Sequence, residues 1–251
     1  MLKKRIIPLL LLKNNKLVKT KKFEEFKDIG NPVSTAKIFS DSDADEIIFL
    51  NINKEKKVED LINYISKIVE KCFIPLSAGG GIKSLDAAIK IIKSGADKIV
   101  LNTICYKNKK LLREIINKLG SQAVIASIDV KFIMNKYVLF SNNGKDKEEI
   151  SLEAHLEYLN EVGVGEVLIN SIDLEGTMIG PDLKLNSIVS TISKSPIIYS
   201  GGVGNYDHIK NLLINKNTSA VACGSIFNFT NTDPIMLKSY LMSNKLNIRI
   251  F

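Results

Sequence analysis

Residues 75–103, PLSAGGGIKSLDAAIKIIKSGADKIVLNT, decide the fold, because their pattern returns at residues 196–225, PIIYSGGVGNYDHIKNLLINKNTSAVACGS. Each stretch contains an apolar strand, a Gly-Gly pair, an amphipathic helix, a second apolar strand and a small polar residue at its end. The two stretches begin 121 residues apart, close to half of the 251-residue chain. The pattern therefore indicates a duplication of half the chain.

Two further matches support the duplication. DEIIFLNI at residue 45 matches GEVLINSI at residue 165, and RIIPLLLLK at residue 5 matches AVIASIDVK at residue 123. The apolar runs are continuous rather than alternating, which is typical of strands covered on both faces. We expect eight strands, at 5–12, 45–52, 73–78, 97–102, 123–130, 165–170, 196–200 and 219–223. We expect helices at 31–43, 57–71, 84–94, 108–118, 151–162, 182–194, 205–215 and 233–243.

Eight strand–helix units in a chain of this length predict a (β/α)8 TIM barrel built from two duplicated half-barrels. The alternative is a doubly wound open sheet, which a duplication disfavours. No linker or change of composition divides the chain, so a single domain over residues 1–251 is expected. The segment KFIMNKYVLFSNNGK departs from the pattern, and strand character at Lys136–Phe140 predicts an extra hairpin after the fifth strand.

Composition narrows the classes of partner. The net charge is +8, but aromatic residues make up only 7% and do not alternate with the basic residues, so no nucleic acid is expected. The basic surface still suits a phosphorylated small molecule. No apolar run approaches the ~20 residues that span a bilayer, so we expect no membrane partner, no targeting segment and a cytoplasmic protein. Three widely spaced cysteines, Cys72, Cys105 and Cys223, predict no disulfide and no metal site, and we expect no cofactor.

The glycine pairs predict phosphate binding, since Gly-Gly lets the backbone approach an anion closely. In each half the pair follows one strand, and small polar residues end the next strand. The loops after strands seven and eight are the usual phosphate site of such barrels. The candidates are Gly80, Gly81, Asn102 and Thr103 in the first half, and Gly201, Gly202, Gly224 and Ser225 in the second. Plain structural turns are the alternative explanation.

Asp129 is the candidate catalytic residue. It ends strand five within an apolar run, and the carboxyl ends of barrel strands face the catalytic mouth. An aspartate that caps the following loop is the alternative. The equivalent position of the first half falls on Leu10 or Leu11, and leucine cannot transfer a proton. His155 and His208 lie on expected helices away from the strand ends, and we assign them no catalytic role.

Specific motifs resemble one enzyme family. They are KRIIP, Lys19, DEIIFL, GGGI, GADK, NT, GSQAV, ID, GEVL, SIDxxGT, SGG and GSIF, and they extend from Lys4 to Phe229. Together they are similar to the cyclase subunit of imidazole glycerol phosphate synthase, from histidine biosynthesis. The resemblance implies a duplicated barrel with a glutaminase subunit docked at its N-terminal face. Ammonia then passes through the core to a bisphosphorylated substrate, and an aspartate after each of strands one and five carries the cyclisation.

Site residues follow from this resemblance. Asp129 matches the second catalytic aspartate, but Leu11 replaces the first, and Asn51 and Glu175 replace two further aspartates. A ring of charges that gates ammonia intake matches Arg5, Glu46, Lys98 and Glu166. Charges that merely cap the strand starts are the alternative for these four. Gly176 joins the phosphate-binding set, and Lys19 matches a ligand-contacting residue on a mobile loop after strand one. A solvated loop lysine is the alternative for Lys19.

The stretches LLLLKNNKLVKT and LINSIDLEGTM resemble a paralogous branch of the family that acts in bacterial surface-sugar biosynthesis. That branch implies a barrel that delivers ammonia, a dedicated glutaminase-like subunit and a separate ATP-dependent sugar amidotransferase. Our leading hypothesis is therefore ammonia channelling for acetamidino modification of a surface sugar, which leaves open whether this chain is itself an enzyme. The alternative is an active cyclase. A third hypothesis is a scaffold that binds the glutaminase and has lost its ligand chemistry.

Overall fold

A closed parallel barrel forms the centre of the computed structural model, which describes residues 3–55 and 57–250. Its strands are β1 (Arg5–Lys13), β4 (Ile47–Asn51), β5 (Leu76–Gly79), β6 (Lys98–Leu101), β7 (Val124–Ile133), β10 (Glu166–Ser171), β11 (Ile197–Ser200) and β12 (Thr218–Cys223). Each strand pairs in parallel with the next in this order, and β12 pairs with β1. This closure confirms the predicted (β/α)8 barrel over the open sheet.

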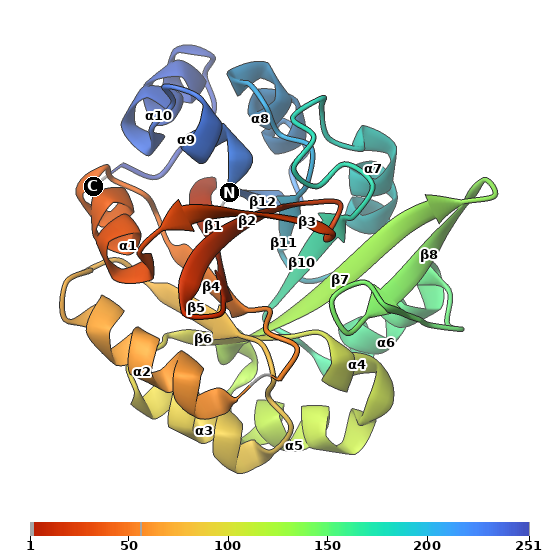
Figure 1. Ribbon diagram of the computed structural model, residues 1–251. Coiled ribbons are helices and arrows are strands. Elements are labelled where there is room, and N and C mark those ends of the chain that lie inside the picture. Colours follow the sequence, from red (N-terminus) through yellow and green to blue (C-terminus); the bar gives the residue numbers. More distant parts are fainter. Residues whose placement is uncertain (1–2, 56, 251) are drawn as a thin grey trace.

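Helices surround the barrel on all sides (Figure 1). The longer ones are α1 (Pro32–Asp41), α2 (Val58–Val69), α3 (Leu85–Lys93), α5 (Lys109–Leu119), α6 (Leu152–Val162), α7 (Leu183–Ile192), α8 (Tyr206–Leu213) and α10 (Pro234–Ser243). Most begin at a polar side chain that accepts from a backbone N–H of the first turn, such as Ser84 before α3 and Asp182 before α7. None of the helices in the described part of the chain is long and apolar enough to cross a bilayer.

The predicted strands and helices are all present, with boundaries that differ from the prediction by at most three residues. The largest difference at a strand start is in β5, which begins at Leu76 instead of residue 73, because Phe73 is 90% exposed and lies outside the barrel. The sequence did not predict two short helices that follow strand ends, α4 (Thr103–Lys107) and α9 (Ser225–Phe229). Each occupies a loop at the mouth of the barrel.

Strand β1 explains why a strand can carry four leucines in a row. Its even-numbered apolar residues pack in the layer between the barrel and the helices, and its odd-numbered ones fill the barrel interior. A strand inside a (β/α)8 barrel is covered on both faces, so both sets must be apolar. Leu11 belongs to the interior set, at the end of the strand that faces the mouth.

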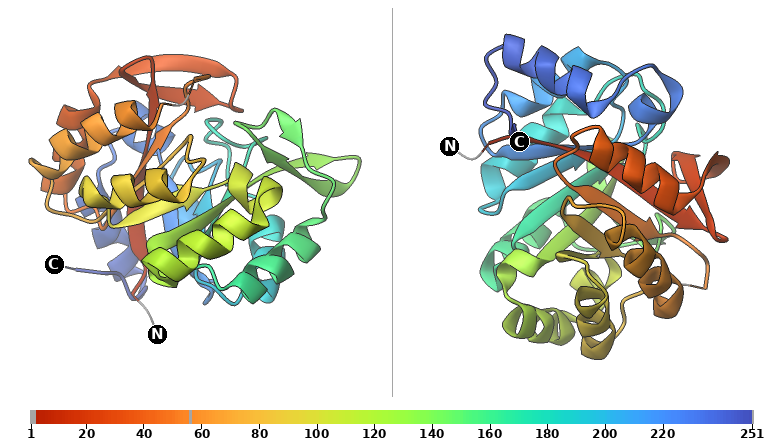
Figure 2. Two further views of the ribbon diagram at one scale, coloured as in Figure 1. Left: turned by 90° about the horizontal axis from the view of Figure 1, so that it is seen from below. Right: turned by 90° about the vertical axis from the view of Figure 1, so that its left-hand side faces the viewer.

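Hairpins extend strands one and five of the barrel above the mouth. Strand β7 continues into β8 (Lys136–Ser141), as the sequence predicted, and then into β9 (Asp146–Lys147). Strand β1 likewise continues into β2 (Lys16–Lys21) and β3 (Glu25–Gly30), where the sequence analysis expected a loop. Both hairpins lie at the opposite end of the barrel from the two chain termini (Figure 2).

The missed hairpin had a signal in the sequence. A shift of 120 residues, the spacing of the repeat, maps β8 (Lys136–Ser141) onto β2 (Lys16–Lys21). The duplication therefore includes the hairpins, and the prediction of one implied the other. The two hairpins approach each other over the mouth, where the ring of Phe23 packs beside Gly144.

Candidate functional site

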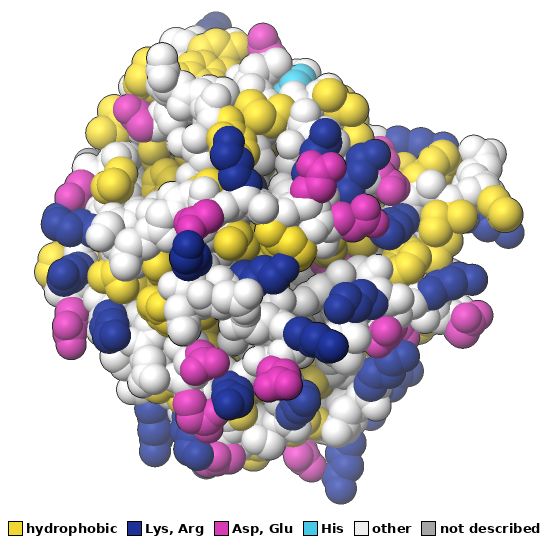
Figure 3. All heavy atoms as spheres, in the orientation of Figure 1, with side chains coloured by type: hydrophobic (Ala, Val, Ile, Leu, Met, Phe, Trp, Pro, Cys, Tyr) yellow, Lys and Arg dark blue, Asp and Glu magenta, His cyan; other side chains and the backbone are white. Residues whose placement is uncertain are grey.

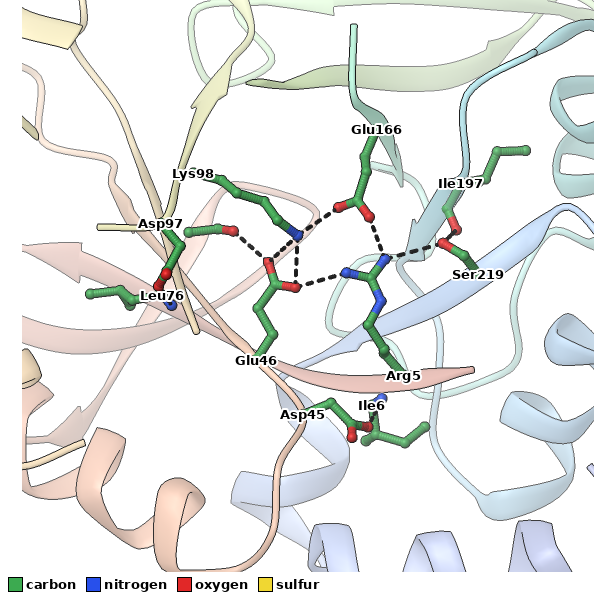
Figure 4. Close-up of polar contacts among 11 residues, drawn as sticks. Arg5, Ile6, Asp45, Glu46, Leu76, Asp97, Lys98, Glu166, Ile197 and Ser219 are labelled. Atoms are coloured by element: carbon green, nitrogen blue, oxygen red, sulfur yellow. Dashed lines mark hydrogen bonds and ion pairs between the residues drawn. The ribbon is translucent and has the colours of Figure 1, made fainter. Parts of the chain in front are cut away.

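Four charged side chains meet at the end of the barrel where the strands begin (Figure 4). Arg5 donates to Glu46 Oε2 at 2.8 Å and to Glu166 Oε1 at 2.6 Å. The ammonium of Lys98 lies 3.0 Å from Glu46 Oε2 and 3.1 Å from Glu166 Oε2. Arg5, Lys98 and Glu166 open three different strands, and Glu46 directly precedes a fourth. The structure therefore brings the four predicted residues into one ring of alternating charge.

The charge ring is stable in a poorly solvated position because its members neutralise one another. Burial by itself lowers the pKa of Arg5, but the carboxylates of Glu166 and Glu46 outweigh burial and raise that pKa above its ordinary value. Ser77 donates a further hydrogen bond to Glu46 Oε1, and Arg5 donates one to Ser219 Oγ at 3.2 Å. Paired and hydrogen-bonded charges tolerate such burial, whereas a single charge would not.

A cavity of about 410 Å³ opens at the other end of the barrel. Leu9, Leu11, Leu50 and Val100 form an apolar wall, and Asp129 lies on the same cavity. The lysines on its border, Lys54, Lys83 and Lys107, are only part of the basic surface. Lys and Arg side chains are spread over this whole face rather than gathered in one stripe (Figure 3). The mouth therefore combines hydrocarbon, the carboxylates of Asp129 and Glu175, and scattered positive charge.

Asp129 is held by two asparagine side chains. Asn170 Nδ2 donates to Asp129 Oδ1 at 2.7 Å, and Asn102 Nδ2 donates to Asp129 Oδ2 at 3.3 Å. Asn170 also donates to Ser127 Oγ at 3.1 Å, which fixes the amide in place. These bonds fix the orientation of the Asp129 carboxylate at the mouth. Leu11 borders the same cavity and supplies no acid–base group.

The first-half glycines lie where the sequence predicted. Gly80, Gly81, Asn102 and Thr103 all border the cavity. Gly80 has φ +105°, and a Cβ at this position would lie 2.1 Å from the carbonyl oxygen of Asn51. Only glycine fits this conformation and this close approach. The backbone of this loop is therefore held near the cavity, as an anion site requires.

The second-half candidates do not line the described cavity, although Ser200 and Glu175, the residues directly before Gly201 and Gly176, do. Gly201 and Gly202 have φ of +112° and +80°, and the carbonyl of Gly202 accepts from Gly180 N–H at 2.8 Å. This bond places the segment after β10 over the glycine pair. Gly176, Gly224 and Ser225 are in the same region and likewise do not border the described cavity. The structure thus assigns the two glycine pairs to different surroundings, which the repeat alone did not show.

Lys19 corrects the prediction of a loop residue. It lies on β2, only 5% exposed, with its Nζ 3.4 Å from Glu175 Oε1. A Cβ built on Gly224 would lie 2.3 Å from that Nζ, so the ammonium packs directly over the glycine. The alternative of a solvated loop lysine is wrong. The buried position results from the β2–β3 hairpin, in which Lys22 N–H donates to the Glu175 carbonyl at 2.9 Å.

The other residues singled out in the sequence have structural surroundings. Asn51 is buried and its side-chain oxygen accepts from Asn53 N–H at 3.0 Å. His155 stacks on Tyr106 between helices, and His208 lies on α8, so neither faces the mouth cavity. The described residues contain no group of three or more His, Cys, Asp or Glu side chains arranged to hold a metal ion. Sequence reasoning missed Asn170, although it is the last polar residue of the run GEVLIN.

Comparisons with known proteins agree with this geometry. A family model described as "Histidine biosynthesis protein" matches residues 5–233. The putative imidazole glycerol phosphate synthase subunit hisF2 of Pseudomonas aeruginosa is 39% identical over 99% of this chain and 100% of its own. The putative subunit HisF of Leptospira borgpetersenii is 38% identical over 96% of both chains, and subunit HisF of a Hydrogenobaculum strain is 35% identical over the full length of both. The chain therefore belongs to the HisF family of imidazole glycerol phosphate synthase subunits.

Proposed function

We propose that this chain is the barrel subunit of a glutamine-dependent amidotransferase. A glutaminase subunit docks at the lower face, and ammonia enters past the charge ring of Arg5, Glu46, Lys98 and Glu166. Between ring and mouth the barrel interior is apolar, with Ile7, Ile48, Ile125, Leu168, Ile198 and Ala220 among its lining. An apolar interior favours neutral ammonia over ammonium, because burying an unpaired charge is costly. The names of the relatives support this proposal, since each is a subunit of a synthase.

A single observation suggests what happens to ammonia at the mouth. Leu11 stands on the cavity at the end of β1, where paired acid–base chemistry with Asp129 needs a carboxylate. A hydrocarbon side chain neither donates nor accepts a proton. We therefore propose that the barrel delivers ammonia to a further enzyme instead of using it for cyclisation. The first strand and the loop after the sixth barrel strand resemble the surface-sugar branch of the family. We therefore propose that an ATP-dependent amidotransferase uses this ammonia for acetamidino modification of a surface sugar.

An active cyclase is the second candidate. The relatives' names favour it over the sugar role, because they name imidazole glycerol phosphate synthase and no sugar enzyme. Asp129, held between Asn170 and Asn102, would have to act alone or with another acid of the cavity. Glu175 also borders the cavity and is already paired with Lys19. Delivery and cyclisation share the route of ammonia and differ only at the mouth.

A cyclase assay with ammonium salt separates the two, because it needs no glutaminase. The purified chain, ammonium and the bisphosphorylated substrate of the histidine pathway are mixed, and loss of substrate absorbance is followed. We expect no turnover by the unmodified chain. Leu11→Asp should raise turnover by about 100-fold over that background, since it restores a second acid–base group.

Leu50→Asp is the matched control. Leu50 pairs with Leu11 in register and borders the same cavity, so the variant adds the same charge one strand away. It should not gain activity. Turnover by the unmodified chain that Asp129→Asn abolishes would contradict delivery and establish the cyclase. Circular dichroism of each variant checks that the added carboxylate leaves the barrel folded.

A further inference from the structure

The hairpin of β7 and β8 ends in an exposed apolar turn. It projects beyond the ring of helices (Figures 1 and 2), and hydrophobic side chains lie at the end of the projecting arm with lysines or arginines beside them (Figure 3). Phe132, Ile133 and Met134 are 46%, 38% and 94% exposed. These are three consecutive large apolar residues at the most remote point of the arm. Neither the barrel core nor the mouth cavity uses them.

Turn geometry does not explain Met134. The two turn residues, Met134 and Asn135, have φ of 46° and 65°. A two-residue hairpin turn with both φ values positive favours Asn and Gly, and a side chain such as methionine is costly there. The chain thus accepts backbone strain and solvent exposure together at Met134. A contact outside the molecule would account for both.

The apolar tip has the shape of a wedge. Phe132 pairs with Tyr137 and Ile133 pairs with Lys136 across the hairpin. Consecutive strand residues point to opposite faces, so Phe132 and Ile133 leave the tip in opposite directions, with Met134 between them. A partner protein with a flat surface would cover only one of the two faces of the tip. The headgroup region of a bilayer is fluid and surrounds a wedge from every side.

The charges beside the tip are complementary to an anionic surface. Residues 130–145 contain Lys131, Lys136 and Lys145 and no Asp or Glu. Lys136 faces Ile133 across the hairpin directly beside the turn, and Lys131 lies on the same face two residue pairs farther back, with its Nζ 5.1 Å over the centre of the Phe140 ring. Two acids contact the pair of residues one step behind the turn: Asp173 accepts from Phe132 N–H at 2.7 Å, and Asp182 accepts from the Tyr137 hydroxyl at 3.0 Å. These bonds tie the Phe132–Tyr137 pair to the body of the protein, so Ile133, Met134 and Lys136 lie beyond the last contact.

We propose that this tip inserts into the headgroup region of a membrane that contains anionic lipid. Phe132, Ile133 and Met134 enter the interface, and Lys131 and Lys136 contact lipid phosphates. The proposal departs from our expectation of no membrane partner, which rested on the absence of long apolar runs. A search for apolar runs of about 20 residues does not detect a three-residue apolar tip. The proposal does not depend on the chemistry at the mouth of the barrel.

Tryptophan fluorescence tests the insertion directly, because the chain contains no tryptophan. Met134→Trp is mixed with vesicles of equal parts phosphatidylglycerol and phosphatidylethanolamine. Its emission should shift to shorter wavelength, and salt at about 0.5 M should reverse the shift by screening the lysines. Phe73→Trp is the control, since Phe73 is 90% exposed elsewhere on the molecule. Its emission should not change.

Co-sedimentation with the same vesicles gives a second measurement. Ile133→Asp should reduce the bound fraction of the otherwise unmodified chain by about tenfold. Ile214 is 62% exposed at the C-terminal end of α8, so Ile214→Asp should leave binding unchanged. Unchanged emission of Met134→Trp, or equal losses for both aspartate variants, would overturn the proposal. If vesicles have no effect and Ile133→Asp releases a protein that co-purifies with the chain, the tip is a protein contact instead.

Discussion

At the scale of single residues, two buried side chains decide the chemistry at the mouth: the apolar Leu11 and the titratable Asp129. Leu11 is exposed by only 7%, yet it borders the mouth cavity, so this one side chain decides whether the first strand contributes an acid–base group to that cavity. Asp129 depends on Asn170 and Asn102 for its orientation. His155 is different, because it lies outside the mouth and affects stability alone.

His155 makes the stability of the fold depend on pH. Its ring stacks on Tyr106 with centroids 4.2 Å apart, and burial, with help from Lys109, lowers its pKa from 6.5 to about 4. Between these two values the unfolded chain binds a proton that the folded chain does not. The free energy of unfolding should therefore fall by about 3 kcal/mol as the pH falls from 6.5 to 4.

Urea unfolding across that pH range measures the effect. His155→Phe keeps an aromatic ring against Tyr106 and removes the titration, so its stability should fall less over the same range. If the unmodified chain and His155→Phe show parallel profiles, another group is responsible for the pH dependence.

At the scale of elements, the hairpins distinguish this barrel from a plain ring of strands and helices. The β2–β3 hairpin is held over the mouth by contacts with the loop after β10. Lys22 N–H donates to the Glu175 carbonyl at 2.9 Å, and Gly176 approaches the backbone of Thr20. Lys19 reaches Gly224 only because this hairpin is in place.

Gly176→Ala should detach the β2–β3 hairpin. The residue has φ +74°, and an added Cβ would lie 2.2 Å from the Thr20 carbonyl oxygen. We expect a loss of at least about 2 kcal/mol in the free energy of unfolding, from the left-handed backbone and the clash together. Limited proteolysis should also become faster within residues 16–30, the two strands of the hairpin.

Gly163→Ala is the matched control for this effect. Gly163 has φ +76°, but no atom lies within 4 Å of the position of an added Cβ. It should cost only about 1 kcal/mol, the backbone part alone. Equal losses for the two variants would show that the contact with Thr20 does not hold the hairpin.

At the scale of the whole molecule, the charge ring joins strands that are far apart in sequence. Arg5, Glu46, Lys98 and Glu166 come from both half-barrels, and each cation contacts both carboxylates. The ring therefore closes the lower end of the barrel as one unit. Removing one carboxylate leaves two poorly solvated cations with a single partner.

Glu46→Gln tests this coupling with a change of charge but not of shape. Glu46 is only 2% exposed and accepts from Arg5, Lys98 and Ser77. We expect the free energy of unfolding to fall by about 3 kcal/mol, because the loss of one partner leaves buried charge uncompensated. Chemical denaturation measures the loss.

The control for the ring is an exposed pair of the same type. Glu161 lies 2.8 Å from Arg113, and its side chain is 69% exposed. Glu161→Gln should cost less than about 1 kcal/mol, since water screens a surface pair. A similar loss for Glu46→Gln would mean that the ring is solvated and does not act as a buried unit.

The resemblance to a known family identified the residues of the charge ring. The sequence by itself determined the barrel, its duplication and the positions of the eight barrel strands and eight longer helices, because local periodicity and a repeat of about 120 residues can be recognised without knowing any contact. The tertiary structure alone decided the contacts between loops. Lys19 is buried over Gly224, Asp129 lies between two asparagines, and the second glycine pair is covered by the segment after β10. The physical reason is that strand and helix patterns repeat along the chain, whereas contacts between loops follow no period and join residues as far apart as Lys19 and Glu175, which are separated by 156 positions.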